Sequence, residues 1–132
     1  MMYAALVSNQ GASYAYSQYR FGWKKIKNRP FDAAELKLNN YIDTTSLIRR
    51  SAVVAFDESL KRFQDWDLWL TMLQQNKIGI FLPDILFRKI VGGRRGYSYW
   101  LPSFFYRLPW KTRAVREYEA ARQVVQLKHR NL

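Results

Sequence analysis

Two carboxylates and a tryptophan stand together at the start of the clearest helical segment of this sequence. Asp65, Trp66 and Asp67 open residues 65–75, where apolar side chains recur at spacings of three and four and therefore predict a helix. A carboxylate with an ordinary pKa is ionised at neutral pH and can accept a proton. The same carboxylates would stabilise the positive end of a helix without doing any chemistry. Both interpretations stay open for Asp65, and the helix-end interpretation is favoured for Asp67.

Two adjacent arginines form a second candidate for chemistry. Arg49 and Arg50 can hold phosphate oxygens through their forked guanidinium groups. The simpler interpretation is that each arginine is solvated or paired with an acidic residue. Arg49 ends residues 41–49, which are β-branched in the middle and predict a short buried strand.

Residues that bind metals or act as thiol nucleophiles are scarce. The sequence has no cysteine and a single histidine, His129. Without cysteine there is no disulfide, thiolate metal site or cysteine nucleophile. We expect His129 to have no partner and not to bind a metal, because it stands alone near the end of the sequence. The sequence therefore predicts no metal site in this chain.

Three sequence blocks at close spacing carry a family resemblance. They are Ser46-Leu47-Ile48-Arg49-Arg50, Phe56-Asp57-Glu58-Ser59-Leu60 and Gln64-Asp65-Trp66-Asp67-Leu68-Trp69-Leu70. In this order they resemble the family 2-like inverting glycosyltransferases of the GT-A fold. The match departs from the family at Gln64, where a glutamate is usual. The resemblance extends more weakly upstream through residues 14–23 and downstream to Lys128, so it covers nearly the whole chain.

The resemblance implies a role for several residues. Asp65 would be the general base that takes the proton of the acceptor hydroxyl during attack on the sugar donor. Trp66 would form a wall of the acceptor pocket. Asp67, Thr44 and Thr45 are further candidates for contact with the acceptor, and Arg49 and Arg50 are weaker candidates for contact with a phosphate or the acceptor. β-branched threonines in a strand need no such explanation, however.

The donor half of such an enzyme is missing from the sequence. The family closes its donor site with an Asp-x-Asp motif and a divalent metal, and Asp65-Trp66-Asp67 is the only Asp-x-Asp present. Gly92-Gly93 is too short to be a glycine-rich phosphate loop. We therefore expect no cofactor in this chain, with Mn²⁺ or Mg²⁺ bound only by a full-length enzyme, and no sugar transfer by this chain alone. Self-association or a separate N-terminal half would supply the rest.

The order of expected elements favours an α/β fold. We predict helices at residues 1–7, 31–38 and 65–75, an amphipathic helix at 111–127, and strands at 12–21, 41–49, 78–82 and 85–91. We predict a basic turn from Gly22 to Pro30, and a turn at Pro83-Asp84 between the last two strands. Residues 1–95 would form the acceptor-side part of a GT-A-like, Rossmann-like domain. Residues 96–132 would add a basic aromatic segment and a C-terminal helix.

Positive charge is concentrated in the last third of the chain. The formal net charge is +12, and residues 88–132 hold 11 Lys/Arg against 2 Asp/Glu. With many tyrosines and tryptophans, residues 96–132 suit an anionic membrane surface, as expected for a cytoplasmic enzyme at the inner face of a membrane that acts on lipid-linked glycans or in polysaccharide biosynthesis. Alternatively, the chain is a non-catalytic module that binds membranes or nucleic acid. Nucleic acid is disfavoured because it leaves Asp65 to Asp67 unexplained.

Overall fold

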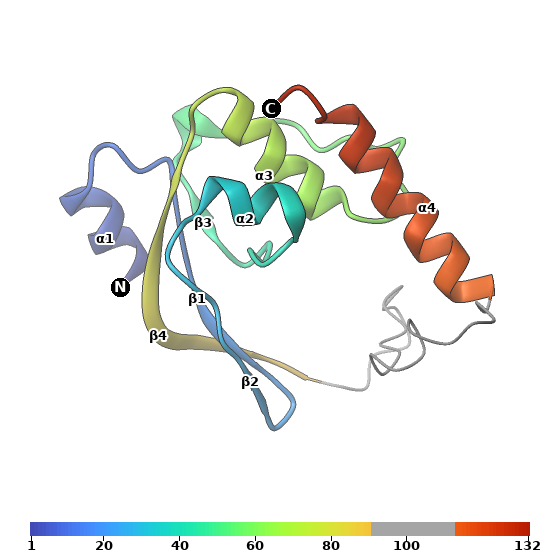
Figure 1. Cartoon of the computed structure of the whole chain (residues 1–132). Helices are drawn as coiled ribbons and strands as arrows, with labels where there is room; N and C mark the ends of the chain where they lie inside the picture. Colours follow the sequence, from blue (N-terminus) through green and yellow to red (C-terminus); the bar gives the residue numbers. More distant parts are fainter. Residues whose placement is uncertain (91–112) are drawn as a thin grey trace.

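The computed structural model describes residues 1–90 and 113–132. Its elements are α1 (Met2–Ser8), β1 (Tyr14–Phe21), β2 (Lys24–Ile26), α2 (Ala33–Leu38), β3 (Leu47–Ile48), the 3₁₀ turn η1 (Arg50–Ala52), α3 (Gln64–Gln74), β4 (Gly79–Lys89) and α4 (Arg113–Lys128). The described part is thus a mixed α/β structure, as the sequence predicts (Figure 1). The predicted boundary between residues 95 and 96, Gly92-Gly93 and most of the aromatic segment lie outside the described residues.

Strand β1 is the centre of a four-stranded mixed sheet. It pairs antiparallel with β3 through Tyr14 and Ala15, antiparallel with β2 through residues 19–21, and parallel with β4 along its whole length. The register passes from Ser17–Leu82 to Gln18–Ile85, so Pro83 and Asp84 form a bulge. The prediction of two strands separated by a turn is therefore wrong. A bulge accommodates Pro83, which has no amide hydrogen to give to the ladder.

Helices cover the two faces of the sheet unequally. Figure 1 shows α2, α3 and α4 together on one side of the sheet and α1 alone on the other. The larger core combines tyrosines of β1 with the buried face of α3 and with Val125 of α4. A smaller core joins Leu6 of α1 to Ala15 and Leu82 of the sheet.

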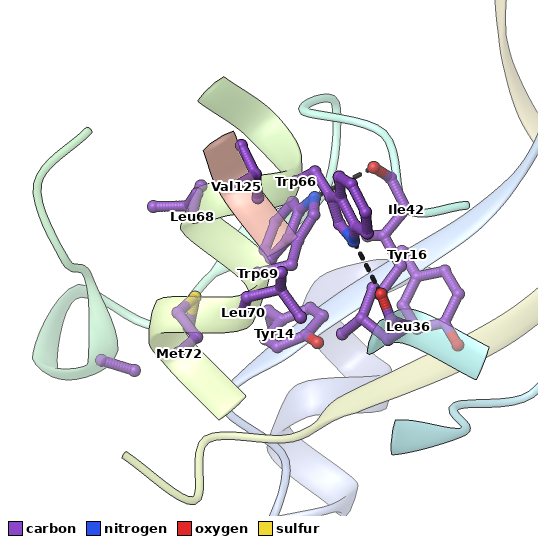
Figure 2. Packing of buried hydrophobic residues seen from close by; sticks show 11 residues of the cluster. Tyr14, Tyr16, Leu36, Ile42, Trp66, Leu68, Trp69, Leu70, Met72 and Val125 are labelled. Atoms are coloured by element: carbon purple, nitrogen blue, oxygen red, sulfur yellow. Dashed lines mark hydrogen bonds between the residues drawn. The ribbon is translucent and has the colours of Figure 1, made fainter. Parts of the chain in front are cut away.

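Two tryptophans of α3 are fully inside the larger core (Figure 2). The indole nitrogen of Trp66 donates a hydrogen bond to the carbonyl oxygen of Leu36 at 2.6 Å, and that of Trp69 donates to Ile42 at 2.9 Å. Buried indoles need such partners. The prediction that Trp69 belongs to the core is confirmed. Trp66 fixes α2 against α3, and Trp69 fixes the segment after α2.

Helix α2 forms where the sequence predicts it, and its start has a side-chain cap. The carboxylate of Asp32 accepts hydrogen bonds from the backbone N–H groups of Ala34 and Glu35, at 2.9 and 3.0 Å. An aspartate at this position satisfies donors that the first helical turn leaves unpaired. The C-terminal half of α2 packs against α3 through Leu36, which is fully buried.

The segment before α3 differs from its prediction. Only Leu47 and Ile48 of the expected strand pair with the sheet. A turn stands before them, because Asp43 Oδ1 accepts hydrogen bonds from both the backbone N–H and the hydroxyl of Thr45. Local side-chain bonds of this kind compete with a strand ladder. The basic segment predicted as a turn, in contrast, contains the short strand β2.

Helix α4 confirms the C-terminal amphipathic helix over its described residues. Val115 and Val125 are fully buried, whereas Val124 is 51% exposed. Among residues 1–90 and 113–132, no helix combines the length and apolarity needed to cross a membrane.

Candidate functional site

Asp65 lies in the first turn of α3 with its carboxylate partly exposed. Asn40 donates a hydrogen bond from its side-chain amide to Asp65 Oδ2 at 2.8 Å, and the backbone N–H of Trp66 donates to Asp65 Oδ1 at 2.9 Å. The helix has no side-chain cap, because Phe63 occupies the cap position in a left-handed conformation. Asp65 is therefore held in place on both oxygens, and each oxygen keeps a lone pair for a further donor.

A lysine paired with a second carboxylate lies against Tyr19, whose hydroxyl is affected by the charge of Asp65. The ammonium group of Lys89 forms an ion pair with Asp43 Oδ2 and stands 5.1 Å from the ring centroid of Tyr19. Burial raises the pKa of the Tyr19 hydroxyl, and the nearby charges of Asp43 and Asp65 raise it further. The Tyr19 ring also stacks on Phe87 with centroids 5.0 Å apart. We call Tyr19, Asn40, Asp43, Asp65 and Lys89 the Asp65 cluster.

One polar atom of this cluster is left without a partner. The amide of Asn40 gives its N–H to Asp65, and its Oδ1 is buried without a hydrogen-bond partner. Rotating the amide by 180° would place an oxygen against the carboxylate, so the observed orientation is the favourable one.

Asp67 has a different environment from Asp65, although only one residue separates them. Its side chain is 3% exposed and its Oδ1 lies 2.7 Å from His129 Nε2. Lys128 approaches the same carboxylate at 2.9 Å and also contacts Asp57 at 2.7 Å. Asp67 therefore joins the end of α4 to α3, and an acceptor contact by Asp67 has no support in this geometry.

The same contacts correct the prediction for His129. The sequence predicts a tail histidine without a partner, but His129 is buried against Asp67. The signal was absent from the local sequence, since 62 positions separate the two residues. Lys128 holds the pKa of Asp57 down at about 2, together with hydrogen bonds from Ser59. We call Asp57, Asp67, Lys128 and His129 the α3–α4 clamp.

Trp66 does not form the wall of an open pocket. Its side chain is 1% exposed and its indole nitrogen is bonded to Leu36. The structure places it inside the core, where it packs edge-on against Phe63. The role of Trp66 observed here is to fix the start of α3, and so the position of Asp65.

The two threonines predicted beside an acceptor are exposed in the turn that contains Asp43. Thr45 donates its hydroxyl to Asp43 Oδ1 at 2.9 Å. The turn therefore brings Thr44 and Thr45 to the edge of the Asp65 cluster, although not through a strand. Sequence reasoning missed Asp43 itself, whose signal was the Asp-x-Thr pattern of a side-chain-bonded turn.

The two arginines have separate environments. The guanidinium of Arg49 donates hydrogen bonds to the carbonyl oxygens of Leu6, Asn9 and Ala12. A cation at the negative end of α1 stabilises the helix, together with the side-chain amide of Asn9, which donates a hydrogen bond to the carbonyl oxygen of Ala5 at 2.9 Å. Arg49 is thus half-buried, and its Nε and one Nη bond backbone carbonyl groups rather than an acidic side chain. Arg50 is exposed and lines a surface groove of about 660 Å³ between α1 and β3.

Within the described ranges, no three histidine, cysteine, aspartate or glutamate side chains gather closely enough to hold a metal ion. Comparisons of this chain with protein-family models, with curated proteins and with solved structures returned no match. The functional assignment therefore depends on the geometry of the Asp65 cluster and on the sequence blocks that surround it.

Proposed function

We propose that this chain is the acceptor-side part of an inverting glycosyltransferase that uses a nucleotide-diphosphate sugar, and that Asp65 is its general base. The observation that supports the proposal is the contrast within the first turn of α3. Asp65 is partly exposed and oriented by Asn40, whereas Asp67 is buried in the α3–α4 clamp. A base must reach the hydroxyl whose proton it takes. Of this pair, only Asp65 has a carboxylate open to a substrate.

The proposed reaction follows from the chemistry of a carboxylate base. Asp65 accepts the proton of the acceptor hydroxyl while that oxygen forms a bond to the anomeric carbon. The bond from this carbon to the diphosphate oxygen breaks, and the nucleotide diphosphate leaves with the electron pair. Attack from the face opposite the leaving group inverts the configuration. The side-chain amide of Asn40 donates a hydrogen bond to Asp65 Oδ2 at 2.8 Å and so orients the carboxylate that takes the proton.

The acceptor in this proposal is a glycan or a lipid-linked saccharide. Thr44 and Thr45 are exposed beside Asp43, and hydroxyl and carboxylate groups are suitable partners for sugar hydroxyls. Trp66 contributes only indirectly, by fixing the start of α3.

The donor site is proposed to lie outside these 132 residues. The sequence holds no Asp-x-Asp apart from residues 65–67, and Asp67 is occupied by His129 and Lys128. A divalent metal would neutralise the leaving diphosphate in the complete enzyme. A longer polypeptide, a separate N-terminal half or a second copy would supply that half, so we expect no sugar transfer by this chain alone.

The membrane contact proposed for residues 96–132 receives limited support from α4. The centre of its apolar stripe, Val115 and Val125, is buried. Arg122 donates a hydrogen bond to the carbonyl oxygen of Leu38 at 2.8 Å, so this cation is used within the protein. The described residues of α4 therefore have a structural role, and a lipid contact is argued from another part of the structure below.

The proposed function is tested by calorimetric titration with UDP-sugars and Mn²⁺. This chain alone should not bind them, whereas a polypeptide extended upstream should. In the extended protein, Asp65→Asn should lower the rate of sugar transfer by about 10²–10⁴-fold and leave donor binding unchanged. Asp84→Asn, which alters an exposed carboxylate in the β4 bulge, is the matched control and should transfer normally.

Two results would contradict this assignment. Tight, metal-dependent binding of UDP-sugars by the 132 residues alone would place the donor site within this chain. An extended Asp65→Asn protein with full transfer activity would remove Asp65 as the base. Failure of both chains to bind any nucleotide sugar would instead reject the glycosyltransferase assignment as a whole.

A further inference from the structure

The turn between β1 and β2 extends beyond the helical layer. Figure 1 shows this hairpin reaching away from α2, α3 and α4. Phe21 pairs with Lys24, so Gly22 and Trp23 alone form the turn. Gly22 has a φ of 58°, a conformation that favours glycine. We define the hairpin tip as residues 20–27 together with residues 88–90, which lie beside it at the end of β4.

Large apolar side chains of the hairpin tip are open to solvent. Trp23 is 89% exposed, Ile90 is 90% exposed and Phe21 is 42% exposed. Isolated exposed apolar residues are common, but a nearly bare tryptophan beside two further apolar side chains is a feature of interaction surfaces. Burial of such side chains against a partner would stabilise a complex through the hydrophobic effect.

Trp23 is held in place rather than free. The guanidinium of Arg88 lies 5.2 Å from the centroid of the Trp23 ring. The same side chain donates a hydrogen bond from Nε to the carbonyl oxygen of Gly22 at 3.1 Å, and the backbone N–H of Gly22 donates to Lys89 at 2.9 Å. These contacts fix the turn against β4 with the indole projecting from it. Little conformational freedom would be lost on binding.

The charge of the hairpin tip has a single sign. The hairpin tip and the residues that flank it, 18–30 and 85–90 in all, hold seven Lys/Arg and no Asp/Glu. Arg29 and Lys89 are paired with Glu35 and Asp43. Five cations of this surface are exposed to solvent, namely Arg20, Lys24, Lys25, Lys27 and Arg88. An anionic partner is therefore the complementary one.

We propose that the hairpin tip binds the surface of an anionic lipid bilayer, with Trp23 at the level of the headgroups. Tryptophan is the side chain most suited to this boundary, and surrounding lysines and arginines are attracted to acidic lipids. The partner is a bilayer rather than a nucleic acid because Ile90 has no aromatic face on which a base could stack. The proposal does not depend on the glycosyltransferase assignment.

The shape of the surface favours the same partner. Strands that read nucleic acid usually line a groove or present a row of stacking aromatics. The groove lined by Arg50 lies between α1 and β3, and β3 pairs with the opposite end of β1 from β2. The hairpin tip is a projection with its apolar side chains at the end, which can enter a headgroup layer.

A fluorophore attached at single cysteines tests where the protein meets the membrane. The chain has no native cysteine, so Lys25→Cys and Ala120→Cys can each be labelled at one position with an environment-sensitive nitrobenzoxadiazole dye. Vesicles of phosphatidylglycerol and phosphatidylcholine should raise and blue-shift the emission at position 25. The emission at position 120, which is exposed on α4, should not change. High salt should release the protein.

Substitutions then test the contributions of charge and of the indole. Lys25→Gln with Lys27→Gln should lower the partition coefficient by about 25-fold, since each cation near an anionic surface contributes about fivefold. Lys61→Gln with Arg130→Gln removes the same formal charge from exposed positions on the helical side and should lower it much less. Trp23→Ala should lower the partition coefficient roughly tenfold. Tyr3→Ala, at a 74% exposed position of α1, should leave the partition coefficient unchanged.

Three outcomes would overturn the proposal. In the first, the protein does not bind anionic vesicles. In the second, it binds but the emission of the dye at position 25 does not change, which places the contact elsewhere. In the third, a single-stranded oligonucleotide would bind in a Trp23-dependent manner and vesicles would not, which makes the hairpin tip a nucleic-acid surface. Circular dichroism of each variant shows that a loss of binding is not a loss of fold.

Discussion

Replacement of Asp67 by alanine removes the acceptor at the centre of the α3–α4 clamp. The carboxylate lies 2.7 Å from His129 Nε2 and 2.9 Å from Lys128 Nζ. The side chains of Asp67 and His129 are each 3% exposed, whereas that of Lys128 is 40% exposed. The contact with His129 is therefore desolvated, and the contact with Lys128 is partly screened.

These exposures set the expected loss of stability. A buried hydrogen bond to a charged group contributes about 1.5–3 kcal/mol, and a partly exposed ion pair about 0.5–1 kcal/mol. Asp67→Ala should therefore lower the free energy of unfolding by about 3 kcal/mol, with His129 left buried and unpaired. Asp67→Asn keeps an oxygen that can accept from an imidazole N–H, so it should cost only about 1 kcal/mol.

Urea unfolding followed by tryptophan fluorescence measures both variants, because Trp66 and Trp69 are buried in the core next to this clamp. Glu58→Ala is the matched control, since Glu58 is an exposed carboxylate one residue from Asp57, and it should change stability by less than about 0.5 kcal/mol. An Asp67→Ala protein as stable as the Glu58→Ala protein would refute the reasoning, because the clamp would then contribute nothing to the attachment of α4.

Three further predictions concern separate parts of the fold. The pKa of Asp57 is depressed to about 2, so its contribution is present above the unfolded pKa of about 3.9 and is lost as the pH falls from there towards 2. Urea unfolding at pH 5 and pH 2 should show a smaller acid-induced loss for Asp57→Asn than for the unaltered protein. Arg49→Ala should free the end of α1 at a cost of about 1–2 kcal/mol, seen as faster amide hydrogen exchange in residues 2–8 with α3 unaffected; equal exchange would contradict the cap. Gly79→Ala should destabilise by about 1–3 kcal/mol, since its Cβ would lie 2.3 Å from the ring of buried Tyr14, whereas Gly11→Ala, with open space around it, should not.

The elements that the sequence predicted correctly are those whose signals are local. Helix α3 follows from apolar spacings of three and four, and α2 from a capping aspartate two residues before the first bonded N–H. Each signal lies within or next to the helix that it predicts, so no knowledge of the tertiary structure is needed. The core position of Trp69 follows from the same periodicity.

The parts that the sequence predicted wrongly depend on contacts between distant residues. Arg49 caps α1 through carbonyl groups about 40 positions away, and His129 meets Asp67 across 62 positions. Nothing near either residue indicates its partner. The bulge in β4 is a further example, because Pro83 marks a turn locally and only the pairing with β1 carries the strand through it.

For the candidate site, sequence and structure each supply a part. The three sequence blocks single out Asp65, and the structure adds Asn40, Asp43, Tyr19 and Lys89, none of which the sequence marks as functional. The sequence favours a helix-end role for Asp67 but not for Asp65, and the structure adds a difference that the sequence does not give, because Asp67 is buried against His129 and Lys128. Burial and long-range partners decide that difference.

The two proposals meet on the same strands. Tyr19 of the Asp65 cluster lies two residues before Phe21 on β1, and Lys89 lies next to Ile90 at the end of β4. At about 3.3 Å per residue along a strand, Tyr19 is roughly 7 Å from the exposed end of the hairpin. With the hairpin tip in the headgroup layer, the Asp65 cluster would stand just above it, at the height of a saccharide carried on a lipid phosphate. This arrangement favours a lipid-linked acceptor over a free glycan, because the bilayer that holds the protein would also present the hydroxyl to Asp65.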